Sequence, residues 1–579
     1  MASTSIPSVE EKRIEEELSF LILLSERIKE AVNEAGTFQS ECTEVGKQVD
    51  RVSQMLRSAV RFATAAAAGS LYDRPVRRIT TEVSRNLDRA LALVRKCKRR
   101  SVLRRVVTIV TQADFRKIQN LLDASIGDMK WLLNIFDYDP ANGGGIVLTL
   151  PPIASNDPIL SWVWSYIACL HLGPLTDKIE AANELSSLAQ DNDRNKKIIV
   201  EEGGVPPLLK LLKESSSPEA QIASATGLFN LANERERVRI IADELGVPII
   251  VQVLGDSPMR VQIRVANLVA RMAEHDPIAQ EDFARENVIR PLVSLLSFET
   301  FDGNQVHPKS QLGKQSIHSI VQINKEMEKN TNHYHTRRLS SSLSFCAEAL
   351  WMLAKGSVSN SRRITETKGL LCLAKLVEKE KGELQFNCLM ALMEIAASAE
   401  SNADLRRAAF KTNSLAAKAA VDQLLRVIKE LDSPSLQIPA IRAIGSLSRT
   451  FPARETRVIG PLVEKLSHRN QEVATEATIS LGKFACSENF LCVEHSKTII
   501  EFNGVPPLMR LLRAGDQAQL HGVVLLCYLA IHAGNSDALE QARVLTALEG
   551  QIRLWLPNAI YHLNLYHAGV QPHRQSFAP

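Results

Sequence analysis

Cysteines and histidines are the residues of this 579-residue chain best suited to nucleophilic or metal chemistry, and their spacing does not favour either. The nine cysteines are scattered, and no two form a C-x-x-C pair. Cys346, Cys388 and Cys527 lie in apolar runs, where cysteine acts as a small hydrophobe. His333 and His335 have no cysteine or carboxylate at ligand spacing. We therefore expect a reducing compartment, no structural disulfide and no metal site.

Signature motifs of catalysis are missing from the sequence. It contains no G-x-x-x-x-G-K-[ST] or G-x-G-x-x-G phosphate loop, no H-E-x-x-H and no G-x-S-x-G. No Cys/His-rich segment precedes the repeats described below, so a ubiquitin-ligase module is not expected. The sequence predicts no catalytic residues, no cofactor and no enzymatic activity.

Basic side chains are concentrated between Arg74 and Arg105. This segment contains twelve lysines and arginines and only two acidic residues, Glu82 and Asp88. Near an anionic membrane each such cation contributes about 1 kcal/mol. The candidates for anion or membrane binding are Arg74, Arg77, Arg78, Lys96, Lys98, Arg99, Arg100, Arg104 and Arg105. A solvated or partner-facing surface and nuclear targeting remain as alternatives. Few aromatic residues accompany the cations, so nucleic acid is not an expected partner.

These cations belong to a region, residues 1–140, whose apolar residues recur at helical spacing. The pattern predicts a bundle of four or five amphipathic helices, with Pro75 opening the third. We expect a linker at 141–158. The apolar stretch Pro158–Leu172 is too short to span a membrane and is predicted to be a buried helix.

A repeat of about 42 residues fills most of the remaining chain. The segment 204–212, GVPPLLKLL, recurs in looser form at 246–254, 288–296, 369–377, 420–428, 458–466 and 504–512. The glycine is expected to end one helix in a left-handed conformation, and proline suits the first turn of the next. This period and this corner are typical of armadillo repeats, which must stack to bury their apolar faces.

One interval between repeats is 81 residues long, which predicts an insertion within a repeat. Its polar, aperiodic sequence favours a disordered loop. The expected organisation is a bundle (1–140), a linker (141–158), repeats (159–297), an inserted polar loop (298–342), further repeats (343–550) and a C-terminal tail (551–579). The predicted fold class is all-α, an N-terminal helical bundle followed by an armadillo-repeat right-handed superhelical solenoid.

Several segments inside and outside the repeats resemble the plant armadillo-repeat-only family. They are 71–79, 191–214, 291–300, 349–356, 391–411 and 455–463. The resemblance implies a scaffold for polarised cell growth. Such a scaffold would bring activating or exchange factors of Rho-of-plants GTPases to anionic plasma membrane. It implies a cytoplasmic protein, peripheral at the plasma membrane, with a nuclear location also open. The insertion is shorter than is usual in that family.

The third helix of each armadillo repeat is expected to line a groove. Alignment of these helices gives the groove-facing candidates Ser187, Asn230, Arg271, Met352, Glu394, Ser446, Lys483 and Tyr528. Nuclear-import adaptors place asparagine at this position and tryptophan four residues earlier. Only Asn230 matches, so an adaptor for extended basic peptides is the less favoured alternative, and a specific protein partner is expected.

Overall fold

The computed structural model describes residues 13–65, 72–98, 110–136, 149–301, 332–411, 413–452, 455–513 and 516–554. The chain forms two compact units, Met1–Ile249 and Ile250–Pro579. The described residues are helical apart from turns and a single isolated β-bridge between Ala35 and Lys98. The predicted all-α class is confirmed.

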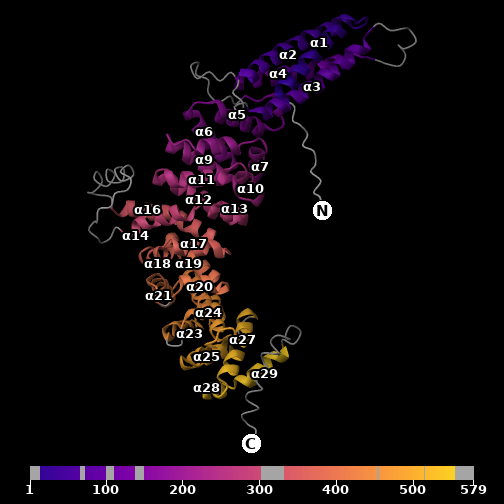
Figure 1. Cartoon of the computed structure of the whole chain (residues 1–579). Helices are drawn as coiled ribbons and strands as arrows, with labels where there is room; N and C mark the ends of the chain where they lie inside the picture. Colours follow the sequence, from indigo (N-terminus) through magenta and orange to yellow (C-terminus); the bar gives the residue numbers. More distant parts are fainter. Residues whose placement is uncertain are drawn as a thin grey trace, which may run out of the picture. The chain divides into compact units, whose positions relative to one another are not determined.

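The first unit begins with four long amphipathic helices that lie side by side (Figure 1). They are α1 (Ile14–Asn33), α2 (Gln39–Ala65), α3 (Asp73–Lys96) and α4 (Gln112–Phe136). Each buries its apolar stripe in a shared core, as Leu18, Leu87 and Leu122 illustrate with no exposed surface. Pro75 lies in the first turn of α3, where its missing N–H costs nothing. The predicted bundle is therefore present.

The predicted linker is in part packed against the bundle. The indole N–H of Trp131 donates to the carbonyl of Thr149 at 2.8 Å. The backbone N–H of Ile153 donates to the carboxylate of Asp128, also at 2.8 Å. Residues 149–157, the later part of the predicted linker, thus form a connection that packs on the bundle and includes the short helix η3 (Pro152–Ala154). Residues 137–148 lie outside the described part.

The same unit continues into repeat helices. They are α5 (Pro158–Leu172), α6 (Leu175–Ala189), α7 (Asp193–Glu201), α8 (Val205–Leu212), α9 (Pro218–Leu231), α10 (Arg235–Asp243) and the start of α11 (Gly246–Asp256). Helix α5 has the predicted bounds and buries Trp164 completely. Among the helices that the structure describes, none is both long and apolar enough to cross a bilayer.

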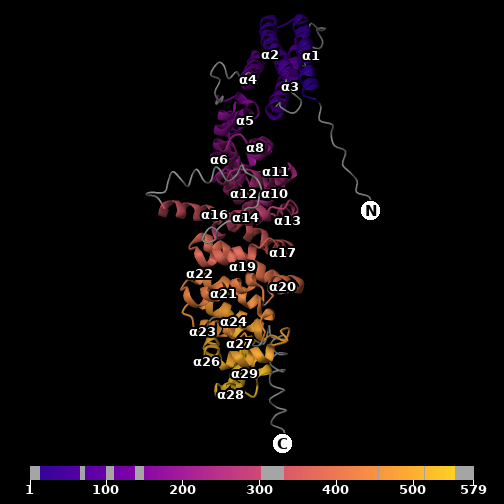
Figure 2. The ribbon, with the colours of Figure 1, turned by 60° about the vertical axis from the view of Figure 1, so that its left-hand side comes forward.

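The second unit continues the three-helix pattern, and its helices follow one another in chain order (Figure 2). They are α12 (Met259–His275), α13 (Pro277–Arg285), α14 (Ile289–Phe301), α16 (Asn332–Ala354), α17 (Val358–Glu366), α18 (Gly369–Lys379), α19 (Glu383–Ser401), α20 (Ala403–Ala409), α21 (Leu415–Glu430), α22 (Pro434–Ser446), the 3-10 turns η4 (Ser448–Thr450) and η5 (Thr456–Val458), α23 (Ile459–Lys465), α24 (Gln471–Ala485), α25 (Cys492–Glu501), α26 (Val505–Leu511), α27 (Asp516–His532), α28 (Asp537–Gln541) and α29 (Val544–Leu554).

Third helices of successive repeats pack directly on one another in this unit, in the order α12, α16, α19, α22, α24 and α27. Hydrogen bonds from side chains to backbone carbonyls fix how these helices are aligned along one another. The amide of Asn387 donates to the carbonyl of Ser344 at 3.1 Å, between α19 and α16. The hydroxyl of Ser480 donates to the carbonyl of Ile441 at 3.0 Å, between α24 and α22. We call the face formed by these helices the third-helix surface of the second unit; α6 and α9 form a third-helix surface of their own in the first unit.

The corner before each second helix differs from the prediction in one respect. Gly204 is not left-handed, with φ of −72°; the residue before it is, with φ of +82° at Gly203. The same place holds Leu245, Asn287, Lys368 and Asn503 in later repeats, all with positive φ. Gly204 is needed for another reason: a Cβ there would lie 2.9 Å from the carbonyl oxygen of Ile199. The glycine therefore permits close packing, and its predecessor makes the turn.

Two predicted boundaries are also corrected. Helices α14 and α16 extend to Phe301 and back to Asn332, so the predicted loop 298–342 is too long at both ends. Apolar periodicity fades before the helical backbone ends, and the sequence pattern detects only the former. Residues 302–331 lie outside the described part. Helix α29 runs to Leu554, past the predicted end of the repeats at 550.

Candidate functional site

Three of the predicted anion-binding arginines are occupied by contacts within the protein. Arg74 donates to the carbonyl of Glu201 in the first complete repeat. Arg77 lies 3.0 Å from the carboxylate of Asp73 and 3.3 Å from that of Glu17. These side chains hold the start of α3 in place, so they are poor candidates for binding a membrane.

Arg78 takes part in a buried junction between the bundle and the repeats. Its guanidinium lies 2.7 Å from Glu202, a carboxylate only 3% exposed, and 5.9 Å from the ring centre of Trp164. The indole N–H of Trp164 donates to the same carboxylate at 2.8 Å, and the hydroxyl of Tyr72 donates to the carbonyl of Glu202 at 2.9 Å. Burial raises the pKa of Tyr72 well above its usual range, so the phenol stays protonated as a donor. The junction satisfies a buried carboxylate that would otherwise be costly.

The opposite end of α3 leaves its cations open to solvent. Arg95 and Lys96 are exposed in the last turn of α3 and form no ion pair within the described residues. Lys98 lies 2.7 Å from Glu34, and both side chains are about half exposed. The candidates Arg99, Arg100, Arg104 and Arg105 follow directly in sequence but lie outside the described residues. Cations at a helix C-terminus also stabilise the helix dipole, so part of this charge has a structural role.

Most groove-facing candidates have accessible side chains on the third-helix surface. Ser187 is exposed, and Asn230, Arg271, Glu394, Lys483 and Tyr528 are partly exposed. Met352 and Ser446 are buried, with 6% and 2% of their surface exposed, which corrects their prediction as groove-facing. At Met352 the accessible side chain is the preceding residue, Trp351. The hydroxyl of the buried Ser446 lies 3.4 Å from the ammonium of Lys483.

Asn230, the position shared with import adaptors, is already engaged. Its amide donates to both the carbonyl and the hydroxyl of Ser186, at 3.0 Å each. The amide that an adaptor would offer to a peptide backbone therefore joins α9 to α6. This contact removes the one position that supported the adaptor alternative.

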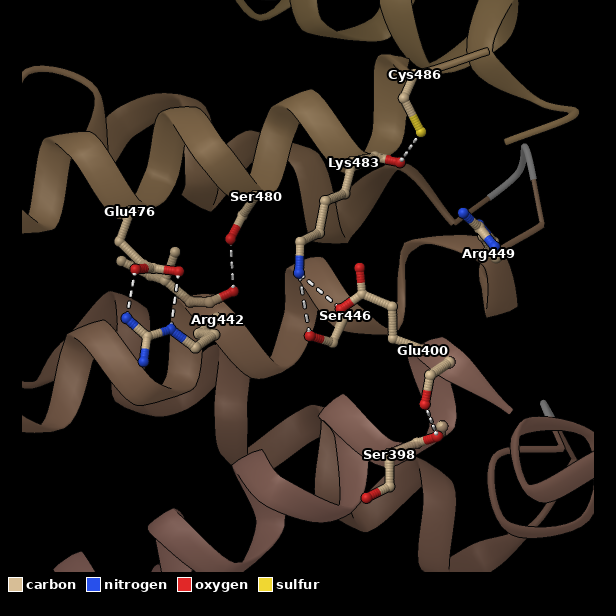
Figure 3. Close-up of polar contacts among 12 residues, drawn as sticks. Ser398, Glu400, Arg442, Ser446, Arg449, Glu476, Ser480, Lys483 and Cys486 are labelled. Carbon is tan, nitrogen blue, oxygen red and sulfur yellow. Dashed lines mark hydrogen bonds and ion pairs between the residues drawn. The ribbon is translucent and has the colours of Figure 1, made fainter. Parts of the chain in front are cut away.

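Ion pairs cross the third-helix surface from α19 to α24 (Figure 3). The guanidinium of Arg442 forms two hydrogen bonds with Glu476, at 3.1 and 2.8 Å. The ammonium of Lys483 lies 2.6 Å from Glu400. Hydrogen bonding to Glu476 raises the pKa of Arg442. These four charges are thus neutralised by the chain itself.

The sequence did not predict an aromatic pair that joins α16 and α19. The rings of Trp351 and Phe386 are 5.9 Å apart and nearly perpendicular, a favourable edge contact. Both side chains are partly exposed. The sequence contains a feature that could have identified Trp351: tryptophan is rare in this chain, and this one is adjacent to Met352, which was predicted to face the groove. Among the described residues, no group of three or more His, Cys, Asp or Glu side chains is arranged to hold a metal ion.

Comparisons with known proteins agree with the repeat geometry. A family model described as a domain of unknown function, DUF7792, matches residues 15–137, which is the bundle. The model of the armadillo/beta-catenin-like repeat matches residues 192–233, which span α7 to α9. No curated protein matches the chain closely enough to count as a relative.

Solved structures of engineered proteins are similar to the chain. A crystal structure of an engineered protein is 23% identical, covers 70% of this chain and 97% of its own, and has a TM-score of 0.46. A designed armadillo repeat protein is 18% identical, with 50% and 99% coverage and a TM-score of 0.38. Another, in complex with peptide (KR)4, is 17% identical, with 50% and 99% coverage and a TM-score of 0.37. The chain carries armadillo repeats, which form a protein-binding scaffold.

Proposed function

We propose that this protein is a non-enzymatic scaffold that binds a protein partner on its third-helix surface. The observation that carries the proposal is the chemically varied set of partly exposed side chains on the stacked third helices of the second unit, from Arg271 to Tyr528. Stacked repeats present such rows as extended binding surfaces. A row of mixed charge and aromatic groups suits a specific protein surface better than a uniform peptide.

The basic end of the bundle is the proposed membrane contact. Arg95 and Lys96 are exposed and form no ion pair with any residue that the structure describes, and the sequence from Arg85 to Arg105 holds seven further cations. If four of these approach an anionic surface, attraction of about 4 kcal/mol is available. That amount supports reversible attachment and fits a cytoplasmic protein peripheral at the plasma membrane. We assign Arg74, Arg77 and Arg78 no part in this contact, because each is engaged by another group of the chain.

The resemblance to the plant armadillo-repeat-only family supplies the proposed context. In that context the bound proteins are activating or exchange factors of Rho-of-plants GTPases, and the scaffold restricts GTPase activity during polarised growth. The family resemblance supports this assignment, and the bundle and repeats are consistent with it.

Vesicle flotation of the full-length protein tests the proposed contact with anionic membrane. We expect recovery with vesicles of phosphatidylcholine containing phosphatidylserine and a phosphoinositide, and little with phosphatidylcholine alone. The variant Arg95→Gln/Lys96→Gln should float less than the charge-matched control Arg362→Gln/Lys429→Gln, whose positions are exposed on repeat helices. Equal recovery with both kinds of vesicle would contradict the membrane contact and leave the protein-binding proposal standing.

A further inference from the structure

Partly exposed side chains of α16 and α19 form a continuous patch on the third-helix surface of the second unit. We call Glu348, Trp351, Phe386, Met390 and Glu394 the Trp351 patch. Its floor is the Trp351–Phe386 edge contact at 5.9 Å, extended by Met390 one turn along α19. A carboxylate lies at each side, Glu348 one turn before Trp351 on α16 and Glu394 one turn after Met390 on α19.

Neither carboxylate has an in-chain cation bound to it. Glu348 forms no ion pair among the described residues, and its nearest charged neighbours include two further carboxylates, Glu383 and Glu274. Arg271 is also near but lies 3.5 Å from Glu274. Burial raises the pKa of Glu348, and the neighbouring carboxylates raise it further.

Glu394 is in a similar situation. The cations that act on it are Lys355, which forms no ion pair within the described residues, and Arg442, which is bound to Glu476. Burial raises the pKa of Glu394. The backbone N–H of Gly356 and the indole N–H of Trp351 lie towards this carboxylate and offset part of that rise, so its donors are neutral groups. The patch therefore contains, around an aromatic floor, two half-buried carboxylates that form no ion pair within the described residues.

The next helices along the same surface provide the contrast. Two other acids have a cation of the chain: Glu476 on α24 binds Arg442, and Glu400 near the end of α19 binds Lys483 (Figure 3). Glu348 and Glu394 have no such partner among the described residues. A half-buried carboxylate is costly unless a positive charge approaches it, and an aromatic face adds cation–π attraction to that charge.

We propose that the Trp351 patch binds an arginine side chain of a partner protein, with the guanidinium over Trp351 and between Glu348 and Glu394. Arginine fits better than lysine because its planar group stacks on an aromatic ring while donating in two directions to carboxylates. The inference rests on the proposed scaffold function and adds the chemistry that the partner must carry.

Selection of displayed dodecapeptides on the purified full-length protein tests the proposal. We expect the selected peptides to be enriched in arginine relative to the unselected library. One selected peptide is then synthesised with arginine and with citrulline, which has the same shape without the charge, and both are measured by fluorescence anisotropy. Citrulline should weaken binding to the unaltered protein about tenfold, the loss expected for one charged contact.

The variant Glu348→Gln/Glu394→Gln should bind both peptides equally, at the weaker level. Glutamine removes a buried charge, so the variant should fold, and a thermal melt checks this. The control Glu378→Gln/Glu430→Gln alters two exposed carboxylates on α18 and α21 and should retain the preference for arginine.

Three results would overturn the proposal. Selected peptides without arginine enrichment would show that the surface binds other chemistry, leaving the scaffold function intact. An unchanged citrulline effect in the Glu348→Gln/Glu394→Gln variant would place the contact elsewhere. Binding only after deletion of residues 303–330 would indicate that the insertion of this chain is the occupant.

Discussion

The ammonium of Lys483 on α24 lies 2.6 Å from the carboxylate of Glu400 on α19, so one ion pair spans the intervening helix α22. The same ammonium lies 3.4 Å from the hydroxyl of Ser446, which is buried on α22 between the two charged residues. The pair thus joins three successive repeats and fills part of the surface that a partner would otherwise contact.

Removal of this pair should weaken the stack only slightly. Both side chains are about one-third exposed, and such pairs contribute roughly 0.5–1 kcal/mol. Urea denaturation of Lys483→Met, Glu400→Gln and the double variant should give a coupling energy in that range. A coupling near zero would mean that the two charges meet without stabilising the repeats.

Substitution at the buried junction of Arg78, Glu202 and Trp164 should lower the free energy of unfolding by more than loss of the Lys483–Glu400 pair. Arg78→Met leaves the carboxylate of Glu202 buried with only Trp164 as a side-chain donor, which should cost about 2 kcal/mol of unfolding free energy. Adding Glu202→Gln removes the stranded charge and should recover part of the loss. If Arg78→Met unfolds at the same urea concentration as the unaltered protein, the junction does not hold bundle and repeats together.

Substitutions at the two adjacent places of the corner should have opposite effects. One place is the glycine before the second helix, and the other is the left-handed residue that precedes it, which is Leu245 in the next repeat. Gly204→Ala introduces a Cβ 2.7 Å from a methyl of Ile199 and should cost about 1–3 kcal/mol. Leu245 is 69% exposed with φ of +60°, a conformation costing leucine about 1–2 kcal/mol that glycine avoids. Leu245→Gly should therefore raise the melting temperature or leave it unchanged. A marked loss on Leu245→Gly would contradict the turn assignment.

Asp128 should make stability depend on pH. Burial raises its pKa from 3.8 to about 6, so the folded state binds a proton more tightly than the unfolded state. Its contribution is present below pH 4 and is lost as the pH rises towards 6. Asp128→Asn stays neutral and still accepts the hydrogen bond from Ile153. The variant should be more stable at pH 7 by up to about 3 kcal/mol, and the advantage should shrink towards pH 4. Urea denaturation at several pH values checks this; an advantage independent of pH would contradict it.

The fold was largely predictable because a 42-residue period and helical apolar spacing are properties of the sequence itself. The close contact of Gly204 with Ile199 was not, because it depends on how tightly two helices meet. The groove prediction identified the right helices but was one residue off at Met352, since the side that faces outward depends on packing with α19. The roles of Arg74 and Arg78 were also hidden, because their partners lie more than a hundred residues away.

Site-specific photo-crosslinking in cells tests the central claim, that the third-helix surface binds a partner protein, most directly. A photoreactive residue at Arg271 or Tyr528, both on third helices of the second unit, should give covalent adducts of larger mass with the same partner proteins. The same residue at Glu378 or Glu430, exposed on second helices, should give none of these adducts. Adducts of equal yield from both sets of positions, or from the second helices alone, would contradict the account.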